Sequence, residues 1–360
     1  MISETHIVLD HGSGGLLSHE LVVEVITKTL GDRHLGKLDD SAVLDCPPGR
    51  LAITTDSFVI DPIFFRNGNI GKVAVCGTVN DLSVSGARPL YLTLALVLEE
   101  GFPIRDLERI LEAVRETARE ANVHIVAGDT KVVRRGEVDK IFINTAGVGT
   151  LDPRRPHPSV HRIEPGDKVL VTGPLGDHAI HILSLREGLG FEDRVQSDCA
   201  PLNGLIAGLI ETLGPDVHFM RDITRGGLGT LLNEVQGGRP WRIEIRETDL
   251  PIKRETAMAA DMLGVSPLYL ANEGNLCVFV PEGAASRALE TIRAHPYGRN
   301  AAIVGDVVAD RRGDNGDSGY SADSRSNDVD TCTHPVVMRK TDGSLDVVEF
   351  LRGAELPRLC

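Results

Sequence analysis

Aspartates stand at the edges of several predicted strands and helices in the first half of the chain. Carboxylates at the ends of separate elements can converge on one hard cation, and magnesium takes oxygen ligands that water and phosphate complete. The set therefore favours a shared magnesium site, although each aspartate alone would also serve as a cap or turn residue. The residues are Asp40, Asp56, Asp81 and Asp129.

A glycine-rich loop near the N-terminus runs into a predicted helix over 16–30. Glycines let several backbone N–H groups approach a phosphate because no Cβ obstructs them. The spacing is neither that of Walker A nor that of the dinucleotide fingerprint, so it supports neither a P-loop nor a Rossmann fold. The loop consists of His11, Gly12, Ser13, Gly14 and Gly15.

The second half of the chain also has an aspartate followed by two glycines at the start of a predicted helix. Asp222 is followed by Ile223, Thr224 and Arg225, and then by Gly226 and Gly227. The pattern predicts a second contribution to the same anionic ligand.

The last residue of the sequence, Cys360, is one of only six cysteines among 360 residues. A thiol on a terminal tail can carry a covalent group, and together with a phosphate-handling body it suggests self-modification. The other cysteines show neither a CxxC pair nor clustered histidines, so neither a disulfide framework nor a zinc site is indicated.

The charge balance restricts the partners. The formal net charge is −14, which argues against nucleic acid or an anionic membrane. The longest apolar stretch, 90–98, is far shorter than a bilayer span, and residues 1–15 lack the pattern of a signal peptide. We therefore expect a cytoplasmic protein.

Periodicity predicts mixed α/β structure in two domains. Strands are expected at 51–55 and 140–145, and helices at 70–85 and 104–122. A proline-dense linker at 152–158 separates the domains. The predicted parts are an N-terminal domain, 1–156; a C-terminal domain, 157–308; a disordered insertion, 309–333; a hairpin of the C-terminal domain, 334–350, turning at Asp342 and Gly343; and a mobile tail, 351–360.

Eight motifs along nearly the whole chain together resemble the HypE family of [NiFe]-hydrogenase maturation factors. This family belongs to the ATP-binding superfamily of aminoimidazole ribonucleotide synthetase, selenophosphate synthetase and thiamine-monophosphate kinase. The insertion at 309–333 is atypical of the family, and Leu359 stands where Ile or Val is more frequent. The motifs are HGSGG, DDSAV, TTDSF, AVCGTVNDLSVSGA, VAGDTKVV, RDITRGGLG, NEGNL and the terminal PRLC.

The resemblance implies an ATP-dependent carbamoyl dehydratase. A carbamoyltransferase, HypF, would place a carbamoyl group on Cys360, and the protein would use ATP and Mg²⁺ to dehydrate it to a thiocyanate. The cyano group would then pass to iron on a HypC–HypD complex. Phosphorylation turns the carbamoyl oxygen into a good leaving group, and such transfers depend mainly on positioning and charge neutralisation.

The resemblance also assigns roles to residues. Lys131 and Glu273 would orient the carbamoyl group and relay its protons; a solvated surface charge and a turn acid are the alternatives for these two. The magnesium ligands would be Asp40, Asp56, Asp81, Asp129 and Asp222. The nucleotide would be bound by the loop His11, Gly12, Ser13, Gly14 and Gly15, and by Asn80, Thr130, Thr224, Arg225, Gly226 and Gly227.

The implied architecture is the two-domain aminoimidazole ribonucleotide synthetase-like fold. An N-terminal α/β domain would pair its sheet with that of a second subunit in a homodimer, and a ferredoxin-like α/β domain would follow, with ATP in the cleft between the domains. Two alternatives stay open: a small-molecule kinase or synthetase of the same superfamily, which would not need Cys360, and a non-catalytic nucleotide-sensing carrier, which would not hydrolyse ATP.

Overall fold

The structure is a computed structural model that describes residues 5–13, 15–32, 34–35, 41–42, 44, 49–309 and 335–351. The chain divides into two compact units. Within the described ranges, the N-terminal unit comprises 5–157 and 177–207, and the C-terminal unit comprises 158–176 and 208–351. Apart from Ala309 and Leu351, the predicted insertion and tail lie outside the described residues.

A four-stranded sheet forms the centre of the N-terminal unit, in the order β1-β6-β4-β5. β4 and β5 are parallel, and the other two pairs are antiparallel. The predicted strands at 51–55 and 140–145 are confirmed as parts of longer strands. The bounds are β1, Arg50–Phe58; β4, Arg88–Glu99; β5, His124–Val133; and β6, Ile141–Leu151, with a small hairpin of β2, Phe64–Phe65, and β3, Gly68–Asn69.

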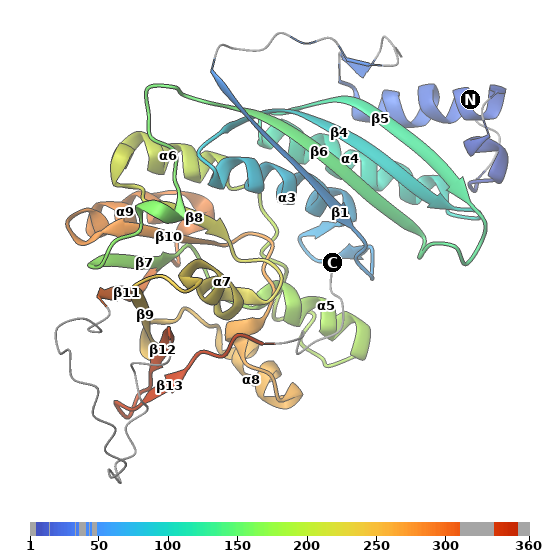
Figure 1. The fold of residues 1–360 in the computed structure, drawn as a ribbon. Helices are drawn as coiled ribbons and strands as arrows, with labels where there is room; N and C mark the ends of the chain where they lie inside the picture. The colour runs from blue at the N-terminus through green and yellow to red at the C-terminus, as the bar shows by residue number, and fades with distance from the viewer. Residues whose placement is uncertain are drawn as a thin grey trace. The chain divides into compact units, whose positions relative to one another are not determined.

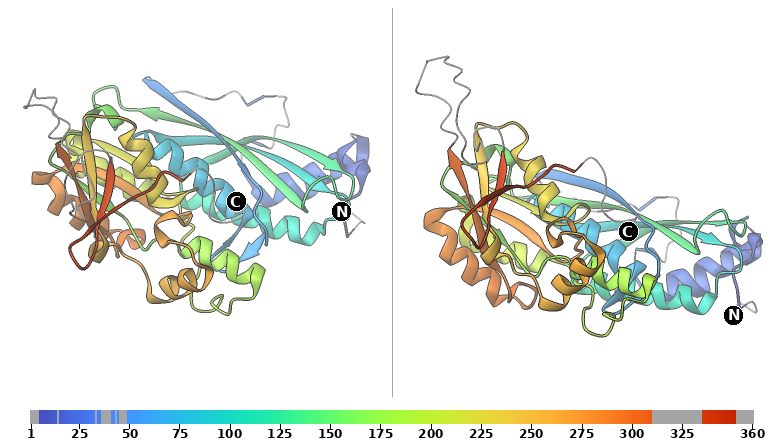
Figure 2. Two further views of the ribbon diagram at one scale, coloured as in Figure 1. Left: turned by 60° about the horizontal axis from the view of Figure 1, so that its bottom comes forward. Right: turned by 90° about the horizontal axis from the view of Figure 1, so that it is seen from below.

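Two helices, α3 (Ile70–Val84) and α4 (Ile104–Glu120), cover one face of this sheet, as Figure 1 and both views of Figure 2 show. Both helices were predicted within two residues of their ends. Asn69 caps α3 by accepting hydrogen bonds at Oδ1 from the backbone N–H groups of Gly71 and Lys72. α4 buries its apolar stripe, Leu107, Ile110, Leu111, Val114 and Ala118, as its helical spacing predicted.

The other face of the sheet carries apolar side chains that the described residues leave uncovered. Leu51 and Ile53 of β1 are 51% and 72% exposed. Val148 of β6 lies beside Ile53 in the strand register and is half-buried. Large exposed aliphatic side chains side by side on a sheet indicate an interaction surface.

The N-terminal segment is less regular than the single helix predicted over 16–30. It consists of a 3₁₀ turn, η1 (Leu9–Gly12), then α1 (Gly15–Glu20), a π-helical stretch, η2 (Leu21–Thr27), and α2 (Lys28–Leu30). Its inward side buries Leu21, Val25 and Leu30. Gly31 ends α2 in the left-handed conformation with φ of 61°.

The segment 177–207 groups with the N-terminal unit, whereas the sequence analysis placed it in the C-terminal domain. The physical reason lies in α5 (Asp177–Glu187), which turns two buried histidines, His178 and His181, against the ring of Phe65. The backbone N–H of Arg66 donates to Nε2 of His181 at 2.9 Å. A domain boundary placed at the proline-rich linker assumes that each domain is one continuous segment. It could therefore not show that 177–207 belongs to the N-terminal unit.

A seven-stranded sheet in the order β13-β12-β9-β11-β7-β10-β8 organises the C-terminal unit. The predicted hairpin is β12 with β13, turning at Gly343 with φ of 87°. The bounds are β7, Asp167–Val171; β8, Phe219–Asp222; β9, Trp241–Arg246; β10, Leu276–Pro281; β11, Ala302–Ala309; β12, Val336–Arg339; and β13, Leu345–Val347.

Helix α7 (Gly227–Gln236) packs Leu228, Leu231 and Leu232 into the main core of this unit, together with alternate residues of the sheet. The helix α9 (Glu282–Ala294) packs along β10, β7 and β11. α8 (Arg254–Leu263) completes the unit, and α6 (Asn203–Leu213) spans the division between units. Short 3₁₀ turns are η4, Val160–Arg162; η5, Gly214–Asp216; η6, Glu247–Asp249; η7, Pro267–Tyr269; and η8, Pro296–Gly298.

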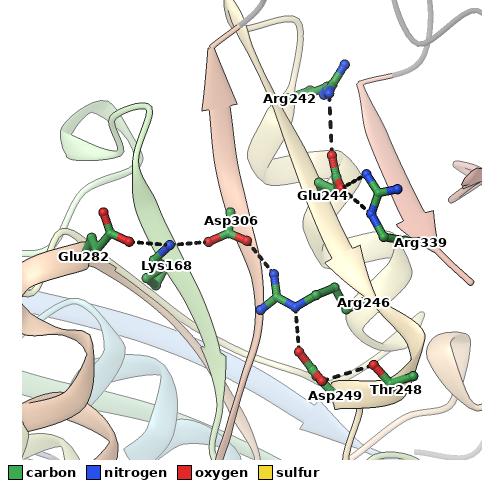
Figure 3. Close-up of polar contacts among 9 residues, drawn as sticks. All are labelled: Lys168, Arg242, Glu244, Arg246, Thr248, Asp249, Glu282, Asp306 and Arg339. Carbon is green, nitrogen blue, oxygen red and sulfur yellow. Dashed lines mark hydrogen bonds and ion pairs between the residues drawn. The ribbon is translucent and has the colours of Figure 1, made fainter. Parts of the chain in front are cut away.

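An ionic row crosses the sheet of the C-terminal unit from β7 to β12 (Figure 3). Asp306 of β11 accepts hydrogen bonds from Lys168 at 2.7 Å and from Arg246. Glu244 of β9 pairs with Arg242 and Arg339. Because these charges lie on neighbouring strands at paired positions, the row joins strands that are distant in sequence.

Candidate active site

A cavity of about 660 Å³ lies in the N-terminal unit between the N-terminal helices and the strands β4 and β5. Its volume falls in the range of small-molecule sites. Gly12, Gly15, Asp129, Thr130 and Lys131, all predicted site residues, line it. Apolar side chains form a further part of its wall, including Val22, Ile26, Leu30, Leu94 and Ile125, and polar residues such as Ser18, His19 and Thr27 also line it. A polar end beside an apolar wall suits a ligand with an anionic part and a flat apolar part.

The glycine loop contributes to this cavity mainly through its backbone. A Cβ on Gly12 would stand 2.6 Å from the backbone nitrogen of Val132, so the loop passes too close to β5 for any side chain there. His11 turns inward, and its Nδ1 accepts from the backbone N–H of Val8 at 3.0 Å. Ser13 donates to the carbonyl of Leu9. Gly12 and Gly15 thus form the loop's described contribution to the cavity wall.

Asp129 and Lys131 form an ion pair on β5. Nζ of Lys131 lies 3.1 Å from Oδ1 of Asp129, and the side chains are 63% and 61% exposed. The same oxygen accepts the backbone N–H of Thr130 at 2.9 Å. The exposure of Lys131 agrees with a solvated surface charge, the alternative that the sequence analysis left open. Its place beside the cavity agrees with the other interpretation, in which it orients the carbamoyl group.

Asp56 and Asp81 both lie where β1 packs against α3. Thr54 donates from Oγ1 to Oδ2 of Asp81 at 2.9 Å. Oδ2 of Asp56 lies against Gly77, one helical turn before Asp81, where a Cβ would stand 3.2 Å away. Because Thr54 and Asp56 are two residues apart on one strand, both face α3. Two half-buried carboxylates at adjacent positions supply the oxygen donors that magnesium prefers.

Asp129 lies on the opposite face of the sheet from Asp56. The register aligns Asp56 with Thr145, Leu94 and Gly128, so the next residue, Asp129, points the other way. Asp56 and Asp81 therefore lie on the α3 side of the sheet, and Asp129 points to the other side. The prediction that all five aspartates share one ion stays a prediction.

Asn80 has an internal partner for each end of its amide. Its Nδ2 donates to the carbonyl of Ala200 at 3.1 Å, and its Oδ1 accepts from the backbone N–H of Leu202 at 2.7 Å. The side chain is 3% exposed. This geometry gives Asn80 a structural role in holding the segment after α5, and its predicted contact with nucleotide stays a prediction.

The predicted glycines of the C-terminal unit shape the start of α7. Gly226 and Gly227 both have positive φ, 79° and 63°. A Cβ on Gly227 would lie 2.5 Å from the carbonyl oxygen of Leu268, so only glycine lets α7 approach η7. Thr224 accepts the N–H of Gly227 at its carbonyl. Arg225 is exposed, and no ion pair joins it to another residue in the described part of the chain.

The loop 272–275 is tied to the segment that carries Asp222 and Thr224. The backbone N–H of Ile223 donates to Asn275, and the carbonyl of Ile223 accepts from Asn272, at 2.9 and 3.1 Å. Asn272 also accepts from the N–H of Gly176 at 2.8 Å through its side chain. Glu273 is 8% exposed in this loop. A buried carboxyl argues against the simple turn acid, since such burial requires partners or a function.

Three predicted site residues, Gly14, Asp40 and Cys360, lie outside the described residues. The described cysteines Cys76, Cys199 and Cys277 are buried, and none of the three is in a disulfide. Burial raises the pKa of the Cys277 thiol well above its usual range. These three thiols are therefore inert as nucleophiles.

The sequence analysis missed two parts of the site. It did not predict the apolar wall of the cavity, although the apolar residues of 16–30 recur at helical spacing and could have indicated it. It also gave Thr54 no role, although its place two residues before Asp56 puts both on one face of a strand.

Among the described residues, no helix is long and apolar enough to cross a membrane.

Comparison with known proteins shows that this chain is similar to AIR synthase related proteins and to hydrogenase expression/formation proteins. The model of the AIR synthase related protein N-terminal domain matches residues 38–151, and that of the AIR synthase related protein C-terminal domain matches 164–315. The chain is 44% identical to the hydrogenase expression/formation protein HupE of Azotobacter chroococcum mcd 1, covering 97% of this chain and 96% of that one. It is 43% identical, over the same shares, to the carbamoyl dehydratase HypE of Azotobacter vinelandii.

Two solved structures are similar over most of the chain. The hydrogenase maturation protein HypE in complex with ATP matches with a TM-score of 0.88 at 42% identity, covering 98% of this chain and 99% of that one. A chain of a HypE–HypF complex matches with a TM-score of 0.74 at 41% identity, covering 91% and 99%.

Proposed function

Since this chain belongs to the HypE family of carbamoyl dehydratases, with the two AIR synthase related domains of that family, we propose that it dehydrates an S-carbamoyl group on its own Cys360. The reaction consumes ATP and leaves a thiocyanate on the same sulfur. The cyano group then serves as a ligand of the [NiFe]-hydrogenase iron.

The cavity beside β5 carries this proposal. It joins the glycine loop to Thr130 and Lys131, residues of two motifs on which the family resemblance rests. A solved structure of a related HypE is a complex with ATP. We infer that the nucleotide places its base against the apolar wall of this cavity, because apolar side chains suit the base.

The chemistry balances in two steps. The carbamoyl oxygen attacks the γ-phosphorus of ATP, ADP leaves, and the nitrogen gives up one proton. The C–O bond then breaks with loss of phosphate, and the second N–H proton leaves as the carbon–nitrogen triple bond forms. The enzyme has to hold the amide in line with ATP and to accept two protons.

We assign proton transfer to Glu273 because its carboxyl is buried in a loop anchored at Ile223. Lys131 orients the carbamoyl oxygen and balances the negative charge that develops there. Asp56 and Asp81 would hold Mg²⁺, because both carboxylates lie where β1 packs against α3. Bound there, Mg²⁺ would neutralise phosphate charge.

The burial of the described cysteines narrows the choice of the carrier thiol. Cys76, Cys199 and Cys277 are buried, so a partner enzyme cannot reach them without local unfolding. Cys46, Cys332 and Cys360 are left as candidates. Of these, the terminal residue of the PRLC motif is the one that the family resemblance assigns as the carrier.

We propose three partners. HypF would supply the carbamoyl group, because a related HypE forms a HypE–HypF complex. A HypC–HypD complex would accept the cyano group. A second copy of this chain would cover the exposed sheet face around Leu51 and Ile53, since exposed aliphatic surface of this kind gains free energy when buried.

Intact-mass measurement of the full chain tests the function. Incubation with carbamoyl phosphate, the carbamoyltransferase and Mg-ATP should first add one carbamoyl group and then remove one water. Hydrolysis of ATP without any carbamoyl gain, together with phosphorylation of a diffusible substrate, would instead identify a small-molecule kinase. If the chain gains the carbamoyl group but neither loses water nor hydrolyses ATP, it is a non-catalytic carrier.

A further inference from the structure

A cluster of two histidines and one aspartate stands at the rim of the N-terminal unit, apart from the residues assigned to ATP. The left-handed Gly31 turns the chain after α2, so that Asp32 and His34 return to the first residue of β5, His124. The ligand atoms of these three side chains lie within 4.8 Å of one another. We propose that Asp32, His34 and His124 form a binding site for a divalent transition-metal ion.

The carboxylate of Asp32 is fixed at both oxygens. Oδ1 accepts the backbone N–H of His34 at 2.9 Å, and Oδ2 lies 2.9 Å from Nδ1 of His124. The Asp32 side chain is only 13% exposed, whereas that of His124 is 41% exposed. One ligand is therefore oriented in advance, and an ion can still enter from the side of His124.

The second imidazole distinguishes this cluster from an ordinary aspartate–histidine pair. The rings of His34 and His124 meet edge to face, with centroids 5.3 Å apart and planes at 71°. Tyr91, the register partner of His124 on β4, places its ring 6.1 Å from that of His34. A salt bridge uses one histidine, while two imidazoles and a carboxylate at one point form a metal-ligand set.

The distances suit a bound ion after a small movement. Ligands at ~2.0–2.2 Å from one ion lie roughly 3–4 Å apart, so separations near 4.8 Å have to shrink by roughly 1–2 Å, and the 2.9 Å between Asp32 and His124 has to lengthen slightly. Imidazole nitrogens favour zinc, copper, iron or nickel, whereas magnesium prefers oxygen donors only. The site is thus chemically distinct from the magnesium site proposed at Asp56 and Asp81.

Bound metal would fasten the end of the N-terminal segment to the sheet. His34 and Leu35 line the cavity beside β5, and His124 begins the strand that carries Asp129 to Lys131. The ion would therefore fix one rim of that cavity and stabilise the N-terminal unit. This inference does not depend on ATP binding or on the carbamoyl chemistry.

Titration of the full chain with Co²⁺ and Zn²⁺, after treatment with EDTA and removal of the chelator, tests the site. Calorimetry should show one saturable ion per chain, and Co²⁺ should give visible absorption without a thiolate charge-transfer band. Excess Mg²⁺ should not displace Co²⁺. The melting temperature should rise with Zn²⁺.

Variants assign the ion to its ligands among the twelve histidines of the chain. His34→Ala and His124→Ala should each weaken Zn²⁺ binding by at least ~10-fold and abolish the rise in melting temperature. The exposed His161 in the C-terminal unit offers the matched control, because His161→Ala should bind like the unmodified chain. Melting without metal verifies that each variant folds. Equal Zn²⁺ affinity in all four proteins, a thiolate band with Co²⁺, or the absence of saturable binding would overturn the proposal.

Discussion

Thr54 of β1 donates a hydrogen bond to the carboxylate of Asp81 on α3, with Oγ1 and Oδ2 2.9 Å apart. The bond joins the edge strand of the sheet to the helix that covers it. It also orients Asp81 beside Asp56, the neighbouring carboxylate. One contact thus contributes to both the fold and the proposed magnesium site, and substitutions can separate these contributions.

Asp81→Asn should abolish ATP hydrolysis while leaving the fold intact. The asparagine oxygen can still accept from Thr54, but the site loses one formal negative charge. We expect hydrolysis to fall by at least ~10²-fold and the free energy of unfolding to change by less than ~1 kcal/mol. The measurements are phosphate release and thermal unfolding.

Thr54→Val provides the matched control for Asp81→Asn. It removes the hydrogen bond and keeps the carboxylate, so it should cost about 1 kcal/mol of stability and leave most of the hydrolysis. If both variants lose activity and stability in equal measure, Asp81 is a structural residue.

Glu273→Gln should stop the reaction after carbamoylation. Glutamine keeps the size of the side chain in its buried loop but cannot accept a proton. Loss of a general base slows proton transfer by ~10²–10⁴-fold, so the carbamoyl group should persist on the tail while ATP still binds. The mass of the tail peptide after addition of Mg-ATP measures this. Glu290→Gln on the exposed side of α9 is the control, and thiocyanate formation at the wild-type rate in Glu273→Gln would refute the assignment.

Asp306 should make the C-terminal unit sensitive to acid. Burial by itself would raise the pKa of Asp306, but hydrogen bonds from Lys168 and Arg246 outweigh it and hold that pKa below its ordinary value near 3.8. A lowered carboxyl pKa contributes stability that is present above the ordinary pKa and is lost as pH falls through the lowered one. The contribution should therefore be complete above about pH 5, begin to decline near pH 4, and disappear only below the lowered pKa.

Asp306→Asn should lower the free energy of unfolding by about 1–2 kcal/mol at pH 7 and by less at pH 3. Denaturant unfolding at the two pH values measures the difference. Asp346→Asn, at a 59% exposed position of β13, should show little change at either pH. A constant deficit for Asp306→Asn at both values would mean that the ionic row does not set the pH dependence.

Ile53→Lys should disrupt the proposed homodimer. A lysine at this 72% exposed position places a charge in an apolar interface without harming the core of the unit. Sedimentation should show a dimer for the unmodified chain and a monomer for the variant. Met262→Lys, at a 68% exposed position of α8, should remain dimeric. A dimer that survives Ile53→Lys would place the interface elsewhere.

Local patterns predicted the regular elements well because their physical causes are local. The apolar stripe of α4 and the Asp342–Gly343 turn of the last hairpin each depend on neighbouring residues. The membership of 177–207 depends instead on His178 and His181 meeting Phe65, more than a hundred residues away in the chain. No pattern within a window of sequence contains that information.

The candidate site was predictable in part for the same reason. The motifs identified residues that line the cavity, such as Gly12 and Lys131. They could not show that Asp56 and Asp129 point to opposite faces, because that follows from the register of four strands. They also could not show that the amide of Asn80 is bonded within the chain.

The most direct test of the central claim is the mass of the tail peptide in two cysteine variants after incubation with carbamoyl phosphate, the carbamoyltransferase and Mg-ATP. Cys332→Ala should gain the carbamoyl group on Cys360 and then lose one water, as the unmodified chain does. Cys360→Ala should gain neither change while still binding ATP. Carbamoyl gain followed by loss of water in Cys360→Ala would contradict the account, because another residue would then carry the group.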